Sequence, residues 1–418
     1  MGRCERRVVV TGMGCVSPYG VGVDLFWNNI KQGKSGVRYL KQVDINKHPV
    51  HIGGEVPEFD TTPYMDAKDA RRMDKFIICA MAAAELAMQD SGLDLDKEDK
   101  TRIGVIAGAA AGGLDTIQKN FENMQIRGFH KASPFMVPSM ICNMAAGKIA
   151  IKYGLRGLSK AVLTACATGA HSVGDAARAI QCNDADIMVA GGAEAGICDL
   201  GLGAFTSAKT LSKSNDNPET ASRPFDVNRD GFIMSEGAGI LILEERERAI
   251  KRGAKIYAEL AGYGQSTDAY DMVAPDPEGR GAILAMQNAL RDADITIDDI
   301  DYINAHGTST RVGDKAESNA IAKLFGDKEK NKNLLVSSTK SMTGHMLGSA
   351  GTVEAIICIK AIQEGVVPPT INLVEQDPEC ANLDYVKNTA RKKEVKYALS
   401  NSFGFGGHNA VLIFKKAQ

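Results

Sequence analysis

The second half of the chain repeats a pattern set out in the first half, and this repetition constrains the fold more than any other feature. Val8-Val-Val10 is a short apolar run followed by Thr11-Gly-Met-Gly14, and Ala258-Glu-Leu-Ala-Gly-Tyr-Gly264 has the same form. We interpret each as a buried strand that ends in a glycine-rich turn. The turn at 11–14 lacks the GxGxxG spacing of dinucleotide-binding loops, which argues against a nucleotide site there.

Strand-like and helix-like segments alternate along the whole chain. This alternation predicts an α/β fold. The segment around Cys166 and the segment around Lys340 and His345 share one design, in which an apolar strand leads through a small polar turn into a long helix of small residues. The sequence therefore predicts two duplicated halves, 1–254 and 255–418, whose strand-to-helix turns face each other. Apolar runs at 103–106, 186–192, 239–244, 300–305 and 334–337 are the predicted strands, and 72–88, 282–293 and 353–363 have helical spacing.

Cys166 lies at the predicted junction of a strand and a helix. Val162 and Leu163 end the strand, residues 164–169 are small or polar, and helical spacing resumes from Ala170 to Ile180. The dipole of a helix favours anions at its N-terminus, so we expect a lowered thiol pKa and a nucleophilic cysteine. A buried structural cysteine is the alternative.

Composition excludes several classes of protein. The 418 residues are 44% hydrophobic and 24% charged, which is typical of globular proteins, and the net charge of -2 argues against nucleic-acid binding. Nine cysteines with no CxxC pair suggest neither a zinc ribbon nor a disulfide framework, and no metal site is predicted. The chain shows no membrane-spanning run and no signal-peptide core, so we expect a reduced, cytoplasmic protein.

Three further segments carry local predictions. Residues 209–232 are polar and turn-rich, which indicates a long loop over the surface or over a site. Gly108-Ala-Ala-Ala-Gly-Gly113 is small enough for a backbone or a ligand to approach closely. Asp314-Lys-Ala-Glu317 has the form of a capping box at the start of a helix.

Four motifs in order resemble the β-ketoacyl-acyl-carrier-protein synthases of the elongating type, and the II subtype is most similar. They are Thr-Ala-Cys166-Ala-Thr-Gly, Asn-Ala-His306-Gly-Thr-Ser-Thr, Ser-Ser-Thr-Lys340-Ser-Met-Thr-Gly-His345 and Asn-Ser-Phe-Gly-Phe405-Gly-Gly-His-Asn. The resemblance covers nearly the whole chain. It implies the thiolase fold, a five-layered α/β/α/β/α duplication, and a homodimer.

The resemblance also implies a chemistry, the decarboxylative Claisen condensation of fatty acid or related polyketide elongation. Cys166 would accept an acyl group as a thioester, while His306 and His345 would donate N–H groups to the enolate formed from a malonyl thioester. Lys340 would hold and polarise the second histidine. The N–H groups of Cys166 and Phe405 would form an oxyanion hole, and Phe405, beside Phe403, would move as a gate.

The substrates of such a synthase arrive on acyl carrier protein, through a phosphopantetheine arm rather than a bound cofactor. Thr308 and Thr310 match positions that hydrogen-bond the pantetheine, Phe205 and Phe232 are expected to contact substrate, and Ala111 to lie at the dimer-side end of the acyl pocket. Met272-Val-Ala-Pro275 departs from the Thr-Ser-Pro version often found near the pantetheine entrance. The residues predicted to form a basic patch for the acidic carrier are Lys68, Arg71, Arg72, Arg127, Lys131 and Lys209.

Three other activities fit parts of the pattern. A thiolase would carry a second catalytic cysteine near its C-terminus, and residues 401–409 contain none. An initiating synthase would pair the cysteine with a histidine and an asparagine, whereas this chain has His345. A catalytically silent chain-length partner subunit would lack the nucleophile, so Cys166 argues against it.

Overall fold

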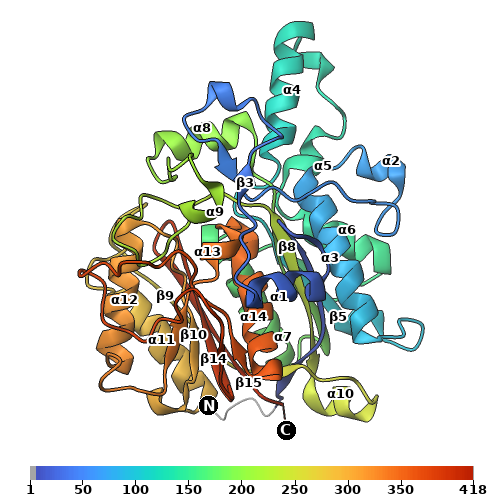
Figure 1. The fold of residues 1–418 in the computed structure, drawn as a ribbon. Helices are drawn as coiled ribbons and strands as arrows, with labels where there is room; N and C mark the ends of the chain where they lie inside the picture. The colour runs from blue at the N-terminus through green and yellow to red at the C-terminus, as the bar shows by residue number, and fades with distance from the viewer. Residues whose placement is uncertain (1–5, 418) are drawn as a thin grey trace.

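The computed structural model describes residues 6–417, and eleven of the strands in that range join into one large mixed sheet (Figure 1). Along the sheet the strands follow the order β11-β10-β14-β15-β9-β1-β8-β7-β5-β6. Their bounds are β1 Val8–Ser17, β5 Ile103–Gly108, β6 Ser159–Lys160, β7 Ile187–Glu194, β8 Gly237–Glu245, β9 Ala258–Thr267, β10 Tyr302–Asn304, β11 Leu335–Ser337, β14 Tyr397–Gly404 and β15 His408–Lys415. Short strands lie outside this path: β2 Gly20–Val21, β3 Arg38–Tyr39, β4 Ile52–Gly53, β12 Val366–Val367 and β13 Arg391–Lys392.

The two ends of this sheet have the same topology. The order β6-β5-β7-β8-β1 in the first half matches β11-β10-β14-β15-β9 in the second. In each half the first three strands are parallel to one another and the last two pairings are antiparallel. Strand β1 joins β9 over Val8–Val10 alone. The predicted duplication is therefore present, and the boundary between residues 254 and 255 stays a prediction.

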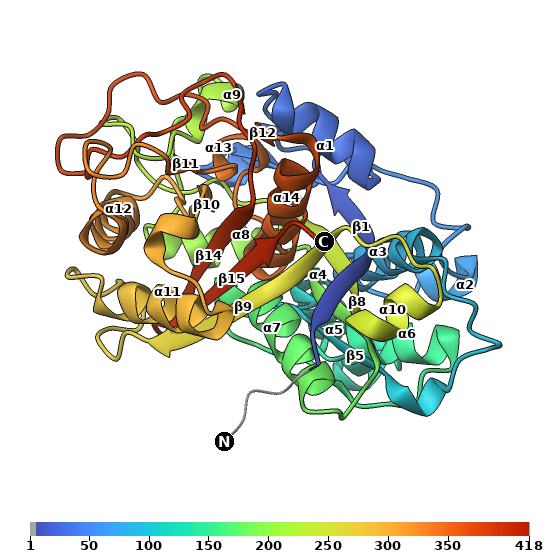
Figure 2. The same ribbon diagram turned by 90° about the horizontal axis from the view of Figure 1, so that it is seen from below.

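Helices form three layers around these two half-sheets. α3 and α6 cover the outer face of the first half, α11 and α12 that of the second, and α7 and α14 lie between them (Figure 2). The five-layered α/β/α/β/α arrangement is as predicted. The helices are α1 Val23–Lys31, α2 Ala67–Ala70, α3 Lys75–Ser91, α4 Leu114–Arg127, α5 Met136–Met140, α6 Met144–Tyr153, α7 Thr168–Gln181, α8 Asp199–Ser207, α9 Pro218–Ala221, α10 Arg246–Lys251, α11 Arg280–Ala293, α12 Arg311–Phe325, α13 Lys340–Thr343 and α14 Ala350–Glu364.

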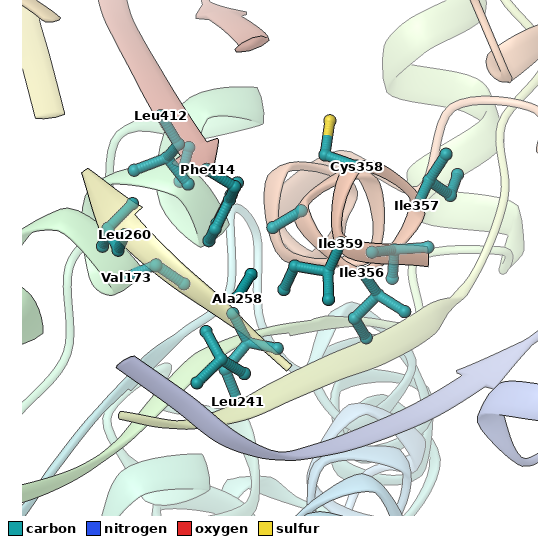
Figure 3. Packing of buried hydrophobic residues seen from close by; sticks show 14 of the residues in the cluster. Val173, Leu241, Ala258, Leu260, Ile356, Ile357, Cys358, Ile359, Leu412 and Phe414 are labelled. Atoms are coloured by element: carbon teal, nitrogen blue, oxygen red, sulfur yellow. The ribbon is translucent and has the colours of Figure 1, made fainter. Parts of the chain in front are cut away.

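The central layer is the core of the molecule. Helix α14 buries 12 of its 15 residues, because it contacts α7 and strands of both halves. Ile356 and Ile359 pack with Val173 of α7, Leu241 of β8 and Leu412 of β15 (Figure 3). Each such side chain contributes about 1.5–3 kcal/mol when fully buried, so this layer fixes how the two halves face each other.

Glycines in the long strands serve close packing, and the predicted glycine turns are wrong. β1 continues through Gly12 and Gly14 to Ser17, and β9 continues through Gly264 to Thr267. A Cβ at Gly14 would lie 1.9 Å from the Ala83 carbonyl oxygen of α3, and one at Gly264 would lie 2.0 Å from the Ala285 oxygen of α11. The repeated glycines therefore let one helix approach each half-sheet, which is the same role in both halves.

Other local predictions also need correction. Val162 and Leu163 follow the two-residue strand β6, and Leu163 is 54% exposed, so they do not end a buried strand. Asp314 and Glu317 lie inside α12 and bond the loops before it rather than forming a capping box. Loop 209–232 contains only the short helix α9. Among residues 6–417, no helix has the length and apolar character needed to cross a bilayer.

Candidate active site

One cavity of about 420 Å³ collects most of the predicted site residues. It lies where the turns of the two halves meet, as the duplication predicts. Of the residues predicted to act or bind, those that line it are Cys166, Phe205, Lys209, Phe232, His306, Thr308, Thr310, His345, Phe403 and Phe405. Lys340, Ala111 and the remaining carrier-patch residues do not line it.

Cys166 is held on a strained turn before α7. Ala165 has a positive φ of 50°, which is rare for a residue with a side chain, and begins the 3-10 turn η4 (Ala165–Ala167). A hydrogen bond of 2.9 Å joins Thr164 Oγ1 to Nδ1 of His171, and the Thr164 N–H donates to Thr168 Oγ1. These contacts fix the turn from the helix side, and His171 has a structural role in them.

Two backbone N–H groups point at the Cys166 sulfur. They belong to Cys166 itself and to Phe405, and both lower the thiol pKa. Phe405 follows Gly404, where a Cβ would lie 2.5 Å from the Thr164 carbonyl oxygen and 3.2 Å from the Cys166 nitrogen. Only glycine allows the two segments to approach this closely. These are the two N–H groups that the resemblance assigns to the oxyanion hole, and that role stays a prediction.

The prediction of a lowered Cys166 pKa is wrong for this structure. Burial raises the pKa of the thiol to about 12, and the Glu194 carboxylate adds to the rise. The Lys340 ammonium and the two N–H groups act in the opposite direction and do not outweigh the loss of solvation. Burial therefore favours the thiol over the thiolate at this position.

His306 and His345 lie edge to face in the cavity, with their ring centroids 5.3 Å apart. The His306 loop is anchored by Glu317, whose carboxylate accepts the N–H groups of His306 (2.8 Å) and Gly307 (2.7 Å). His345 donates its backbone N–H to the Ile233 carbonyl at 2.7 Å. Hydrogen bonds of the backbone N–H groups therefore position both histidines, and the ring nitrogens take no part in these bonds.

Both imidazoles are neutral. Burial lowers the pKa of each histidine well below its ordinary value, and the Lys340 charge lowers both further. Neither ring nitrogen of His345 has a hydrogen-bond partner within residues 6–417. A neutral imidazole carries one N–H, so each ring can donate a hydrogen bond to an oxygen that develops negative charge.

Lys340 is a buried residue and contacts a carboxylate instead of a histidine. It is 1% exposed, and its Nζ donates to Glu354 of α14. The predicted contact with His345 is absent from the described hydrogen bonds, so Lys340 acts on both histidines through its charge. Burial raises the pKa of Glu354 to about 7, while the lysine opposes that rise.

Apolar residues pack around Cys166. Ile197, Leu202, Phe232 and Leu347 form a buried cluster with it, with Phe205 and Ala110 packed against them. The Phe232 ring lies 5.2 Å from His345 and 5.6 Å from Phe205. Phe403 is 5.7 Å from His306. Because Ala110 rather than Ala111 packs on this cluster, the role of position 111 stays a prediction.

The cavity is also lined by residues at the start of α12 and in the loop after β9. Thr308 and Thr310 have their hydroxyl oxygens 3.0 Å apart, and Val273 and Pro275 belong to the loop after β9. Buried Arg229 donates to the carbonyls of Thr310 and Arg311, which fixes the threonine segment.

The predicted carrier-binding residues are spread over several elements. Lys209 lies on the cavity wall, whereas Lys68 and Arg71 are on and after α2, and Arg127 and Lys131 are near the end of α4. Arg72 stacks over the Phe135 ring at 4.3 Å. Their joint role as a carrier patch stays a prediction.

Comparison with known proteins decides the family. The model described as "Beta-ketoacyl synthase, N-terminal domain" matches residues 5–249, and "Beta-ketoacyl synthase, C-terminal domain" matches residues 257–374. The chain belongs to the β-ketoacyl synthase family. It is 51% identical over 413 residues, 99% of each chain, to the 3-oxoacyl-acyl-carrier-protein synthase 2 of Vibrio harveyi.

Solved ketosynthases share the fold. A β-ketoacyl synthase from Burkholderia phymatum STM815 superposes with a TM-score of 0.91 at 35% identity, covering 99% of this chain and 100% of the other. A type II PKS acyl-carrier protein in complex with its ketosynthase bound to the hexaketide gives a TM-score of 0.89 at 37% identity, with 99% and 100% coverage. The resemblance inferred from the four motifs is therefore confirmed.

The synthase site also contains residues that the sequence did not reveal. Glu317, Glu354, Glu194 and Arg229 hold the loops that carry the predicted residues, and all four are buried. Acidic and basic residues are seldom buried, so their positions in the sequence gave no signal of this role.

Proposed function

We propose that this protein condenses malonyl-acyl carrier protein with an enzyme-bound acyl thioester to give 3-oxoacyl-acyl carrier protein, in fatty acid or related polyketide chain elongation. One observation carries the proposal: a cysteine whose sulfur meets two backbone N–H groups shares a cavity with two neutral histidines. The first set suits acyl transfer, and the second suits enolate formation.

Acyl transfer uses the first set. The Cys166 sulfur attacks the thioester carbonyl of an acyl carrier, and the N–H groups of Cys166 and Phe405 stabilise the oxyanion. The carbon–sulfur bond to the pantetheine then breaks, and the pantetheine leaves as a thiol with the proton that Cys166 has lost. The step is neutral in protons overall. Because burial favours the thiol, we expect this proton to leave as the substrate binds.

Condensation uses the second set. The malonyl carboxylate leaves as carbon dioxide, and its electron pair forms an enolate whose oxygen accepts N–H groups from His306 and His345. Such donors contribute about 3 kcal/mol each. The enolate carbon attacks the Cys166 thioester, the new carbon–carbon bond forms as the carbon–sulfur bond to Cys166 breaks, and the cysteine leaves as a thiolate that takes up one proton from solvent. Phe403 and Phe405 would shield this chemistry from water, and the phosphopantetheine arm would enter past Thr308 and Thr310.

The competing activities fit the cavity less well. Residues 401–409, where a thiolase would place its second cysteine, hold Phe403 and Phe405 instead. A catalytically silent chain-length partner subunit transfers no acyl group, so the N–H groups that converge on Cys166 would have no catalytic role in it.

The test is acylation followed by mass spectrometry of the intact protein. Incubation with an acyl carrier thioester should add one acyl group, mapped by digestion to Cys166, and malonyl carrier protein should then release a 3-oxoacyl product. Cys182→Ser, which removes an exposed cysteine, is the matched control and should keep the adduct. Absence of any adduct on the unaltered protein would favour the silent partner subunit.

We also propose that the protein is a homodimer. Strand β6 is an edge strand of the large sheet, and both of its residues are exposed. Helix α4 contains no buried residue. Exposed apolar side chains occur on or next to both elements, with Leu163 after β6 at 54%, Ile126 in α4 at 84% and Phe129 after α4 at 71%. A second copy placed over β6 and α4 would cover them. Leu163→Lys should shift the protein to monomer in sedimentation, whereas Val374→Lys, at an exposed apolar site elsewhere, should not.

A further inference from the structure

A second pocket for negative charge exists in the molecule, at the start of α14, and a buried carboxylate fills it. Glu194, the last residue of β7, is 0% exposed. Its Oε2 accepts the N–H groups of Ala110 (2.7 Å) and Gly348 (3.1 Å), and its Oε1 those of Ala111 (3.3 Å) and Gly112 (3.2 Å). Every described hydrogen bond to this carboxylate comes from the backbone.

This pocket is the counterpart of the Cys166 site in the duplicated fold. Leu347 has a φ of 47° and begins a 3-10 turn, Leu347–Ser349, that leads into α14, just as Ala165 does before α7. Gly348 therefore occupies in the second half the position that Cys166 occupies in the first. One helix start carries Cys166, and the other receives Glu194.

Glycine makes room for the carboxylate. A Cβ at Gly348 would lie 2.5 Å from the Ala110 nitrogen and 2.8 Å from Glu194 Oε2. Gly112 has a φ of 71°, which turns the 110–112 loop so that three successive N–H groups face one side chain. These glycines therefore leave space for the side-chain carboxylate of Glu194.

The carboxylate holds two parts of the wall beside Cys166. Ala110, which it bonds directly, and Leu347, which precedes the bonded Gly348, both pack in the apolar cluster that contains Cys166. Leu347 also follows His345 by two residues on the same segment. The contacts of Glu194 therefore link loops of both halves on the acyl side of the cavity.

We infer that Glu194 is a positioning residue for condensation, whose carboxylate fixes Ala110 and Leu347 as the wall against which an acyl chain is measured. The inference rests on the proposed function, because it names what selects the acyl group in that reaction. Glutamine would keep the shape of the side chain but would place an amide NH₂ against N–H groups, so the two loops would lose their common anchor.

The experiment measures kcat/KM of Glu194→Gln with a series of acyl carriers of increasing length. We expect the ratio of kcat/KM between the best and the poorest primer to fall about tenfold or more, because a displaced wall no longer contacts the methylenes of the acyl chain. Loss of the Glu194 charge should also move the pH profile of Cys166 alkylation to lower pH, because that charge raises the thiol pKa. Glu194→Asp keeps the charge and should retain the alkylation profile.

The controls separate this role from general stability. Glu244→Gln removes another fully buried carboxylate, one that pairs with Arg248 and Arg252 away from the cavity, and should lower the melting temperature without changing primer selection. If Glu194→Gln does not fold, Gly348→Ala, which displaces the carboxylate, should show the same loss of selection. Unchanged selection in a folded variant, or an equal change in Glu244→Gln, would overturn the inference. If the unaltered protein forms no product, the proposed function fails instead.

Discussion

Replacing Gly404 with alanine should separate acyl transfer from decarboxylation. The new Cβ would lie 2.5 Å from the Thr164 carbonyl oxygen and 3.2 Å from the nitrogens of Cys166 and Ala167. The closest of these atoms is backbone, which cannot turn aside as a flexible side chain could. The segment of Gly404 and Phe405 must therefore move away from Cys166, and the Phe405 N–H moves with it.

The size of the effect follows from the loss of one donor. Removal of a single oxyanion-hole hydrogen bond slows acyl transfer by about 10²–10³-fold, or about 2.7–4 kcal/mol. His306 and His345 are anchored by Glu317 and the Ile233 carbonyl, neither of which contacts Gly404 in the described hydrogen bonds. Decarboxylation of malonyl carrier protein should therefore stay within about threefold of the unaltered rate, a difference of less than 1 kcal/mol.

The assay compares two rates on the same preparation, acyl adduct formation at Cys166 by rapid-quench mass spectrometry and carbon dioxide release from malonyl carrier protein. Gly203→Ala is the matched control, because a Cβ there meets nothing within 4 Å and should leave both rates unchanged. Normal acylation by a folded Gly404→Ala protein would refute the assignment of the Phe405 N–H to the oxyanion hole.

Three further predictions concern buried charge and the carrier. Lys340→Met should lower the free energy of unfolding in urea by about 3–5 kcal/mol, because it leaves Glu354 buried without its cation, and Lys340→Met with Glu354→Gln should recover part of that loss. Burial raises the pKa of Glu194 to about 7, so the stability from this group is present below its ordinary pKa of 4.5 and is lost as the pH rises through 7. The free energy of unfolding of the unaltered protein, measured by thermal melts, should therefore rise by up to about 3 kcal/mol relative to that of Glu194→Gln as the pH falls across that window. A difference between the two proteins that does not change with pH would contradict the raised pKa. Reversing Lys68 and Arg71 to Glu should raise the KM for acyl carrier protein and spare turnover of a pantetheine thioester, and equal losses on both would point to misfolding.

Sequence patterns predicted the parts of this structure that depend on local order. Alternating segments were enough for the α/β class, and the repeated units were enough for the two duplicated halves. The five layers, and the residues Cys166, His306 and His345 that meet in the cavity, came from the resemblance of four motifs to a known family. Such patterns are local, and the residues that they single out lie at the ends of strands, where a duplicated α/β fold brings its turns together.

The remainder depended on contacts that no local pattern contains. Gly14 lies in a strand and lets a helix pack closely against it, but the sequence around it looks the same as the sequence around a glycine in a turn. Position at a helix start could be predicted for Cys166, but the burial that raises its pKa to about 12 comes from segments far along the chain. Glu194 and Glu354 are isolated acidic residues in sequence, and only the fold surrounds them with N–H groups and a lysine.

The most direct test of the proposed division of labour is the activity of Cys166→Ala in one assay that records carbon dioxide release and 3-oxoacyl product together. The substitution removes the acyl acceptor and leaves both histidines and Lys340 in place. We expect no condensation product, with malonyl decarboxylation retained or increased. Condensation at the unaltered rate would contradict the assignment of the nucleophile, and loss of decarboxylation in a folded variant would contradict the separate role of the two histidines.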